Sequence, residues 1–276
     1  MNGSTAARTA AVISYIEAHL HEKLDLDTVA RAACYSKFHL HRMFADTAGV
    51  TPHGYIQRRR LTEAARLLVF SDEPIIEIAL TAGYESQQAF TSVFKSMYKR
   101  TPLAYRREGA FYPLQLALAL NQNPAAPGDA PREVLYAAPA DIPDWMRFVS
   151  LVIDGFPRLD EAAHLERIGR RVRRRQALIM RDGPVIMGAA AFSRRTGNID
   201  FLAVHPQYRR HGVDRALLDF MARDLLTGRA LSVTTFRRGD RADPGQREAY
   251  MRLGFAESEL LTEFGYPTQR LILLPK

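Results

Sequence analysis

The stretch CYSKFHLHRMFADTAGVTPHGYIQRRR, residues 34–60, recurs in altered form as GYESQQAFTSVFKSMYKRTPLAYRR, residues 83–107. Both copies contain, in the same order, a tyrosine, a short polar turn, a helical segment ending in phenylalanine, a Thr-Pro pair and a tyrosine followed by arginine. Around them, from Ala6 to about Arg107, apolar residues recur at helical spacing and strand patterns are absent. The repeat therefore predicts a bundle of short helices in which one structural unit is used twice.

In each copy, apolar and polar residues fall on opposite faces of the central helix. Leu40 and Phe44 share one face in the first copy, and Phe90 and Phe94 do so in the second. The opposite faces suit DNA, since Arg pairs with guanine, Gln pairs with adenine, and Phe or Thr can contact the thymine methyl group. A solvated face explains any one such helix equally simply. Here, however, each helix follows an acidic-capped helix and a turn, and precedes a basic segment suited to phosphates, which is helix-turn-helix order.

Residues from about 10 to 107 resemble the DNA-binding domain of the AraC family of transcription regulators. The segments YSKFHLHRMF, GYIQRRRLTEAARLL and GYESQQAFTSVFK are similar in particular to the MarA/SoxS/Rob branch, whose members bind as monomers through two recognition helices in successive major grooves. The resemblance implies double-stranded DNA as a partner, and RNA polymerase as a second partner if the protein is an activator. The base-reading candidates that it implies are Phe38, His41, Arg42, Gln87, Gln88 and Ser92. Helical periodicity places Lys37, Thr91 and Lys95 beside the same faces, so they are candidate DNA contacts too.

Three of these residues depart from the branch that the segment resembles. Phe38 stands where a tryptophan is usual, His41 where a glutamine is usual, and Ser92 where an arginine is usual. The target DNA sequence should therefore differ in detail from that of the branch. His41 either contacts a base or phosphate or is merely solvated.

The pattern changes after the helical third. From Arg132 onward, short apolar runs such as QALIM, VIMGAAAF, IDFLAV and ALSVTTF alternate with helical segments, as in an α/β domain. Between the two regions, NQNPAAPGDAP is rich in Pro, Ala, Asn and Gly and has almost no hydrophobic periodicity, as expected of a linker. The preceding FYPLQLALAL, residues 111–120, fits either a last helix or a strand, and could also form a dimer contact. We predict a DNA-binding domain over residues 6–112, a linker over 113–131 and an α/β domain over 132–276.

The stretch IDFLAVHPQYRRHGVDRALLDFMA, residues 199–222, together with REAYMRLGFAE, residues 247–257, resembles the GNAT acyltransferase superfamily. In that superfamily a central strand is splayed from its neighbour so that acyl-CoA lies in the gap. Backbone N–H groups at a helix N-terminus, aided by nearby arginines, are suited to bind a pyrophosphate. The resemblance implies acetyl-CoA as a cofactor, with the backbone of the strand and the loop after it as the binding site: Leu202, Val204, Arg209, Arg210, His211, Gly212, Val213 and Asp214.

Asp214 stands where the superfamily has glycine or alanine. A carboxylate in the first turn stabilises a helix by roughly 0.3 to 1 kcal/mol, but the same position brings it near any bound phosphate. If the side chain caps its own helix, cofactor binding survives with reduced affinity. If it points into the loop, it takes the place of the phosphate.

Acetyl transfer to an amine needs removal of a proton from the amine, and often a group that protonates the departing thiolate. Tyr250 matches the tyrosine acid of the superfamily, although a tyrosine packed beside the cofactor groove is an equal alternative. Many members carry a glutamate base where this chain has Asn198, which cannot accept a proton. Asp200 is the nearest substitute base, unless it is an ordinary solvated or ion-paired carboxylate. Enzymatic activity stays open.

The composition sets further limits. A formal net charge of +8 favours polyanionic partners such as nucleic acid, and the run RRVRRR, residues 170–175, is either a solvated face or a contact for an acidic ligand or the DNA backbone. The single cysteine, Cys34, excludes an internal disulfide and is expected to be packed, and no Cys/His cluster has the spacing of a metal site. No apolar run approaches the roughly 20 residues of a membrane helix, which favours a cytoplasmic protein.

Three functions remain. The first is a transcription regulator whose GNAT-like domain binds acyl-CoA or a small amine and modulates DNA binding. The second is a regulator that is also an active amine N-acetyltransferase. The third is a regulator whose second domain serves only as an interaction surface.

Overall fold

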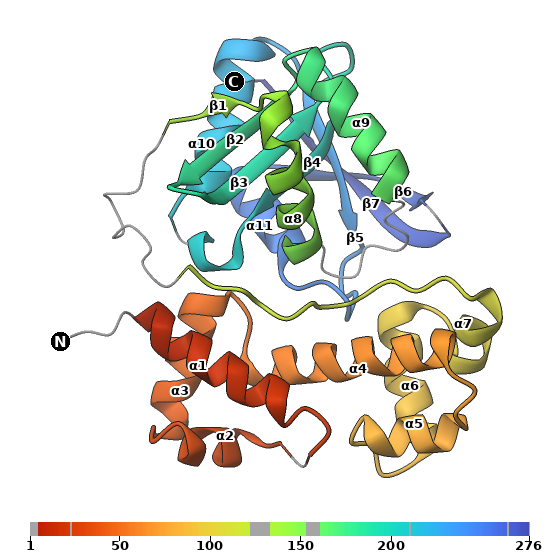
Figure 1. Cartoon of the computed structure of the whole chain (residues 1–276). Coiled ribbons are helices and arrows are strands. Elements are labelled where there is room, and N and C mark those ends of the chain that lie inside the picture. Colours follow the sequence, from red (N-terminus) through yellow and green to blue (C-terminus); the bar gives the residue numbers. More distant parts are fainter. Residues whose placement is uncertain are drawn as a thin grey trace. The chain divides into compact units, whose positions relative to one another are not determined.

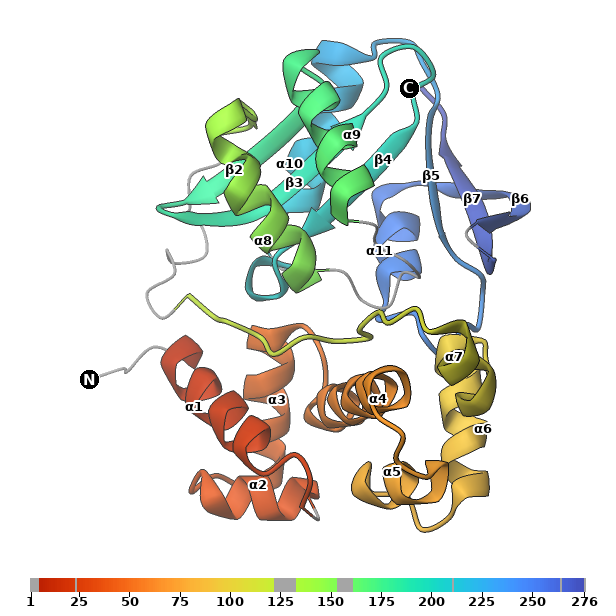
Figure 2. The same ribbon diagram turned by 45° about the vertical axis from the view of Figure 1, so that its right-hand side comes forward.

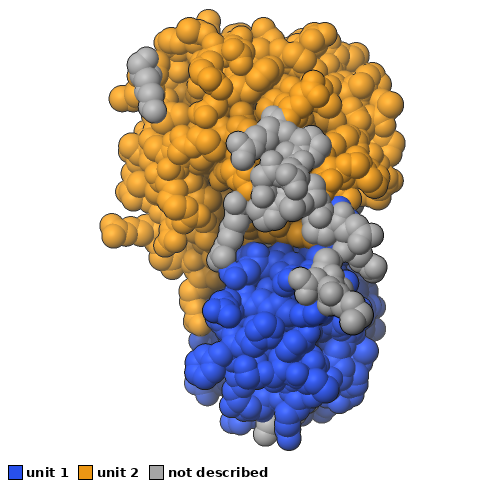
Figure 3. Space-filling view, turned by 90° about the vertical axis from the view of Figure 1, so that its left-hand side faces the viewer, with its two compact units in different colours: residues 1–123, 153–158 blue, residues 124–152, 159–276 orange. Residues whose placement is uncertain are grey.

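The computed structural model describes residues 5–22, 24–121, 133–152, 161–209, 211–263 and 265–275. The chain divides into two compact units, one helical and one that combines helices with sheets (Figures 1 and 3). The predicted fold class, a helical domain with two helix-turn-helix motifs followed by an α/β domain, is therefore confirmed. The predicted domain boundaries stay a prediction.

The helical unit has a long central helix, α4, with three helices before it and three after it (Figures 1 and 2). The helices of each half pack on one another and on α4. The described helices of this unit are α1 (Thr5–Ala18), α2 (Leu26–Ala32), α3 (Lys37–Ala48), α4 (Pro52–Phe70), α5 (Ile75–Thr81), α6 (Gln87–Tyr98) and α7 (Pro102–Glu108).

The two halves repeat each other down to the residues that begin and end their helices. Ser36 caps α3 and Ser86 caps α6, each accepting a hydrogen bond from a backbone N–H three residues later. The Thr-Pro pairs cap α4 and α7 in the same way. Helix α3 ends at Gly49 (φ 71°), and α6 ends at the equivalent Lys99 (φ 60°), so a lysine occupies the left-handed conformation that favours glycine.

The turns between the two helices of each motif are also alike. Cys34 (φ 57°) ends the turn after α2, and Gly83 (φ 81°) ends the turn after α5. The amide of the next residue in each, Tyr35 and Tyr84, donates back to the preceding helix. Cys34 is exposed, so the expectation that it is packed is wrong. Its left-handed backbone belongs to a tight turn, which leaves the side chain at the surface.

Residues 111–120 are an extended segment without regular secondary structure, neither the helix nor the strand considered from the sequence. The segment groups with the helical unit. Backbone N–H groups of Leu114 and Leu118 donate to side chains of α4, so the described part of the predicted linker, residues 113–121, begins as a packed part of the helical unit.

The α/β unit contains two antiparallel sheets, ordered β1-β2-β3-β4 and β5-β7-β6. Helices α8 and α9 lie on one face of the first sheet and α10 on the other, while α11 contacts β5 (Figures 1 and 2). The strands are β1 (Leu135–Tyr136), β2 (Ala177–Asp182), β3 (Val185–Phe192), β4 (Ile199–Val204), β5 (Leu231–Phe236), β6 (Ala256–Glu263) and β7 (Tyr266–Leu273). The helices are α8 (Ile142–Val152), α9 (Glu161–Arg173), α10 (Val213–Phe220) and α11 (Gln246–Leu253), with short 3₁₀ turns at Pro139–Asp141 and Pro206–Tyr208 and a π turn at Met221–Leu225.

Strands β4 and β5 meet at one end only. Asn198 and Ser232 form an isolated parallel bridge, and the Ser232 N–H donates to the carbonyl of Gly197 at 3.1 Å. A Cβ on Gly197 would lie 2.3 Å from the carbonyl oxygen of Ala230, so the close approach requires glycine. Beyond this joint the two strands belong to separate sheets, as the predicted splay requires.

Candidate nucleic-acid interface and small-molecule site

The outer face of α3 carries the residues predicted to contact DNA. Lys37, Phe38, His41 and Arg42 are all exposed, while the apolar residues of the opposite face are buried. The Phe38 side chain is 90% exposed. A bare phenyl ring beside cationic side chains is suited to contact a thymine methyl group while its neighbours bind phosphates or bases.

Two cationic side chains on this face differ in their partners. Lys37 forms an ion pair with Asp27 of α2. Arg42 forms no hydrogen bond or ion pair with the residues that the structure describes, so its guanidinium can bind an external partner without first breaking an internal one.

The outer face of α6 has the same organisation. Gln87, Gln88, Ser92 and Lys95 are exposed, and Thr91 is half-buried. The face combines amide and hydroxyl groups, which can form hydrogen bonds with base edges, with one cation. The structure thus brings the predicted DNA-contacting residues of each helix onto one outward face.

The basic segments after the recognition helices were expected to hold phosphates, and most of their arginines do something else. Arg58 and Arg59 are buried. The guanidinium of Arg106 donates to the carbonyls of Leu68 (3.2 Å) and Glu73 (2.6 Å). Arg59, which is buried, is paired with Glu17 and donates to the carbonyl of Gln115 at 3.2 Å. Arg59 and Arg106 therefore serve internal acceptors. Arg107, which is exposed, stays a candidate phosphate contact.

Arg60 is a structural residue that the sequence analysis missed. Its Nε donates to the carbonyl of Leu20 at 2.9 Å, and its Nη2 donates to the carbonyl of Glu22. A Cβ added to Gly83 would lie only 2.7 Å from Nη1 of Arg60. Arg60 therefore binds the loop after α1 and lies against the turn of the second motif. No local sequence signal separates it from the arginines beside it.

The backbone of β4 forms one side of the second candidate site. The His205 N–H donates to the carbonyl of Met187 at 2.8 Å, and the antiparallel pattern alternates along the strand, so the backbone groups of Leu202 and Val204 face away from β3. The Tyr250 hydroxyl donates to the Leu202 carbonyl at 3.2 Å. One of the two backbone acceptors predicted for a ligand is thus already bound to the protein's own tyrosine.

Tyr250 itself is only 4% exposed. Burial raises the pKa of its hydroxyl, the hydrogen bond from Gln246 lowers it, and the carboxylates of Asp214 and Asp243 raise it further. The hydroxyl therefore stays protonated at neutral pH. The hydroxyl has the proton that an acid needs, but that proton is engaged in the hydrogen bond to the Leu202 carbonyl.

The predicted pyrophosphate loop leads into α10. Gly212 (φ 71°) precedes the helix, and open space lies where its Cβ would be. Val213 is buried, and a Cβ on Gly188 of β3 would come within 2.4 Å of its side chain, so α10 lies close against the sheet. Of the other predicted loop residues, Arg209 and His211 are half-buried and Arg210 lies outside the described residues.

Asp214 lies in the first turn of α10, whose N-cap is Gly212, and its side chain binds the backbone of its own helix. Its Oδ1 accepts from the Arg215 N–H at 2.8 Å. An N–H that a phosphate would use is therefore occupied, and a negative charge lies in the first turn. The open position at Gly212 fits a CoA pyrophosphate, whereas Asp214 does not.

Asp200 is an ion-paired carboxylate. Its Oδ2 accepts from Nε of Arg171 at 2.8 Å, and its Oδ1 accepts from Nδ2 of Asn198 at 2.7 Å. Both carboxylate oxygens of Asp200 are thus engaged by the protein's own side chains, so the geometry does not support Asp200 as a base. A second arginine of the run at residues 170–175 also has an internal partner, because Arg170 forms an ion pair with Glu166.

Among the residues that the structure describes, no helix is long and apolar enough to span a bilayer. No group of three or more His, Cys, Asp or Glu side chains in the described ranges could hold a metal ion.

Comparison with known proteins gives two family matches. A family model described as a helix-turn-helix domain matches residues 29–108, and one described as an acetyltransferase (GNAT) domain matches residues 155–266. Regulatory protein SoxS of Escherichia coli is 42% identical over 95 residues, which is 34% of this chain and 89% of SoxS. The probable transcription factor PqrA of Proteus vulgaris is 40% identical over 100 residues, which is 36% of this chain and 82% of PqrA.

Two longer relatives match over a similar number of residues. The uncharacterized regulator YbfP of Bacillus subtilis is 46% identical over 94 residues, which is 34% of this chain, and the regulator Rob of Salmonella typhimurium is 45% identical over 96 residues, which is 35% of this chain. The chain spans about a third of the length of these two relatives, 32% and 33%.

Two solved structures each match part of the chain. The C-terminal domain of AraT from Geobacillus stearothermophilus covers 37% of this chain and 84% of its own, with 31% identity and a TM-score of 0.36. An acetyltransferase of the GNAT family from Bacillus cereus covers 52% of this chain and 97% of its own, with 15% identity and a TM-score of 0.41.

Proposed function

The chain belongs to the AraC family of DNA-binding transcription regulators and carries a GNAT domain, and from this we propose that the GNAT domain is a sensor that binds acyl-CoA or a small-molecule effector and modulates DNA binding. Binding to DNA supports a cytoplasmic location, in the compartment that holds a bacterial chromosome. RNA polymerase would be a further partner of an activator.

Recognition of a specific DNA sequence is assigned to the outer faces of α3 and α6. The observation that carries this assignment is the exposed, internally unpaired guanidinium of Arg42 beside a 90% exposed Phe38. An arginine and a bare aromatic ring, side by side on the second helix of a helix-turn-helix motif, provide hydrogen bonds to guanine and an apolar contact to thymine. The glutamines of α6 supply groups for adenine in the second half of the site.

The ligand site is assigned to the gap between β4 and β5. Leu202 and Val204 would offer outward backbone groups to the pantetheine and acyl parts, and the loop at Gly212 would approach the pyrophosphate. Acyl-CoA, when bound, supplies an activated thioester carbonyl. Residues of this chain bind and orient it, and Asp214 opposes its phosphates.

A sensor fits the geometry better than an enzyme does. Asn198 cannot accept a proton, and Asp200 is paired with Arg171. The Tyr250 proton is engaged with a backbone carbonyl. Groups suited to binding are thus present, while the proposed base is not free to act.

Calorimetric titration of the intact chain with acetyl-CoA tests ligand binding, and DNA affinity measured with and without that ligand tests modulation. We expect measurable heat and a changed DNA affinity. Absence of heat at high acetyl-CoA concentration would leave the acyl-CoA assignment without support. Unchanged DNA affinity despite binding would refute the modulation.

Asp214→Asn tests whether the carboxylate opposes the cofactor. Two unit charges about 4 Å apart interact by about 1 kcal/mol in water, so the variant should bind acetyl-CoA about fivefold more tightly. Asp219→Asn, which removes a carboxylate near the other end of α10, is the matched control and should leave the affinity unchanged. Equal effects of the two variants would show that Asp214 is not specifically in the way.

A second candidate function, amine N-acetylation, is favoured by one observation. The protonated Tyr250 hydroxyl, which matches the tyrosine acid of the superfamily in the sequence motif, contacts the backbone of β4 beside the proposed ligand site. Acetyl-CoA with a panel of amines should release free CoA only if the domain is an enzyme. Loss of that release in Tyr250→Phe would support the role of the tyrosine as an acid.

A further inference from the structure

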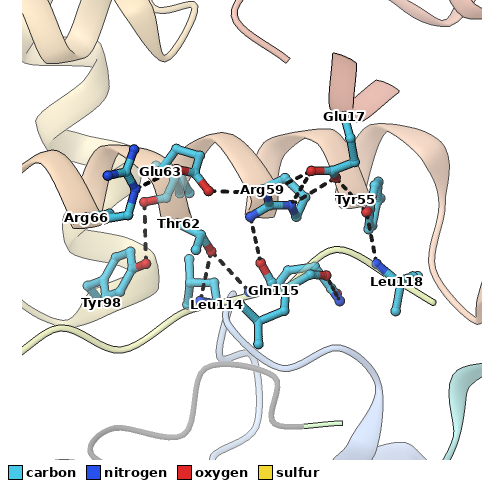
Figure 4. A network of polar contacts seen from close by, with 12 residues as sticks. Glu17, Tyr55, Arg59, Thr62, Glu63, Arg66, Tyr98, Leu114, Gln115 and Leu118 are labelled. Carbon is cyan, nitrogen blue, oxygen red and sulfur yellow. Dashed lines mark hydrogen bonds and ion pairs between the residues drawn. The ribbon is translucent and has the colours of Figure 1, made fainter. Parts of the chain in front are cut away.

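Residues 112–118 form an extended segment, here called the strap, which runs along α4 and is bound to it by side chains (Figure 4). The strap lies on the side of α4 away from α2 and α5 (Figures 1 and 2). It contains none of the residues predicted to contact DNA. Any effect of the strap on DNA recognition must therefore be exerted through the helices.

One end of the strap is fixed to the second half of the helical unit. The Tyr112 N–H donates to the hydroxyl of Tyr105 in α7 at 2.9 Å. The Tyr112 hydroxyl donates to the carbonyl of Tyr98, the last residue of α6, at 3.3 Å. The three rings also pack together, with centroids 4.9 to 5.8 Å apart. The strap thus begins at the C-terminal end of the second recognition helix.

The middle of the strap is fixed to α4 by one threonine. The hydroxyl oxygen of Thr62 accepts from the N–H of Leu114 at 3.0 Å and from the N–H of Gln115 at 3.1 Å (Figure 4). Thr62 is 1% exposed. Two backbone donors that would otherwise be buried without a partner therefore depend on a single side-chain oxygen.

The far end of the strap is fixed to the first half. The Leu118 N–H donates to the Tyr55 hydroxyl at 3.2 Å, and that hydroxyl donates to Glu17 of α1 at 2.7 Å. Arg59 is paired with Glu17 and also donates to the carbonyl of Gln115 at 3.2 Å (Figure 4). The strap therefore reaches α1, which packs on the first recognition helix, α3.

We propose that the strap fixes the separation of the two recognition helices and so sets the half-site spacing of the DNA that the protein binds. The inference rests on the proposed recognition of DNA by both α3 and α6. A helix of the length of α4 can bend, and bending it would move α6 relative to α3. The strap connects the end of α6 to α1 alongside α4 and resists that bending. Thr62 and Tyr55 are positioning residues in this scheme.

The readout follows from DNA geometry. One base pair added between half-sites shifts one of them by about 3.4 Å and rotates it by about 35° around the helix axis. A protein with rigidly placed recognition helices discriminates strongly against such a change, whereas a flexible one tolerates it. Loss of fold stability alone weakens binding to every spacing equally.

The test uses the intact chain and a DNA site that this chain selects from random sequence. Affinities are measured for the selected site and for versions with one base pair inserted or removed between the half-sites. Thr62→Val and Tyr55→Phe each remove the hydroxyl on which the strap depends. We expect both variants to lose about three- to tenfold of the discrimination between spacings, the equivalent of about one hydrogen bond, while keeping most of their affinity for the selected site.

Two comparison variants isolate the strap. Thr9→Val removes the hydroxyl of another fully buried threonine, which donates within α1, and should keep the discrimination. Thr62→Ser keeps the hydroxyl and should keep the discrimination between spacings at the level of the parent protein. Discrimination that is unchanged in both Thr62→Val and Tyr55→Phe, or lost equally in Thr9→Val, would overturn the proposal. Selection of a site with a single half would instead refute recognition by two helices.

Discussion

Arg42→Ala is the substitution that most directly tests DNA recognition. The Arg42 side chain is exposed on α3 and has no internal partner among the described residues. Lys37, on the same helix and also exposed, is paired with Asp27. The two exposed cations of α3 therefore differ in side-chain type, in internal partner and in the expected DNA contact.

The expected magnitudes follow from those partners. A bidentate contact between arginine and guanine is worth about 1 to 3 kcal/mol, so Arg42→Ala should weaken binding to the selected site about five- to 150-fold. The side chains of Lys37 and Asp27 are 53% and 51% exposed, and an exposed pair contributes at most about 1 kcal/mol. If a DNA phosphate replaces Asp27 as the partner of Lys37, the net gain is the energy of the phosphate contact minus that of the lost ion pair. Lys37→Ala should therefore cost less than about threefold.

Fluorescence anisotropy with labelled DNA, at several salt concentrations, separates the two kinds of contact. Arg42→Ala should reduce affinity for the selected site, leave affinity for unrelated DNA nearly unchanged, and relax the preference at one base position. Equal weakening on both DNAs, with a shallower salt dependence, would identify Arg42 as a phosphate contact and refute its assignment to a base. A larger loss from Lys37→Ala than from Arg42→Ala would refute the argument from internal partners.

Two further predictions concern stability. Lys99→Gly should raise the free energy of unfolding by about 0.5 to 1 kcal/mol, because a φ of 60° is costly for lysine. Gly49→Lys introduces the same cost at the end of α3, so urea unfolding of the two variants should show effects of opposite sign. Burial raises the pKa of Asp243, so the folded parent protein loses stability as pH rises and this carboxyl group gives up its proton. Asp243→Asn removes that loss, so the free energy of unfolding of the variant relative to the parent should increase as pH rises from about 3 to about 7. A difference between parent and variant that is independent of pH would contradict the second prediction.

The sequence predicted the features that are local in the chain. Helical periodicity, the serine and threonine caps and the repeated turn each involve residues within a few positions of one another, so they are visible as patterns. The outward faces of α3 and α6 followed from the same periodicity. The splay of β4 from β5 came from the resemblance.

The features that the sequence did not predict depend on partners far apart in the chain. Thr62 binds the backbone of Gln115 across 53 positions, and Arg171 pairs with Asp200 across 29. An extended segment held by side chains has no periodicity of its own, which is why residues 111–120 fitted both helix and strand. A run of arginines likewise says nothing about which of them will meet an internal acceptor.

The internal partners of several arginines change what the net charge of +8 indicates about DNA binding. Arg59 and Arg106 are held by internal acceptors, and Arg171 is paired with Asp200. The salt dependence of DNA binding counts the phosphates that cations of the protein neutralise, not the charge of the whole chain. The exposed Lys95 and Arg107 therefore matter more to that dependence than the arginines with internal partners, even though the net charge counts all of them equally.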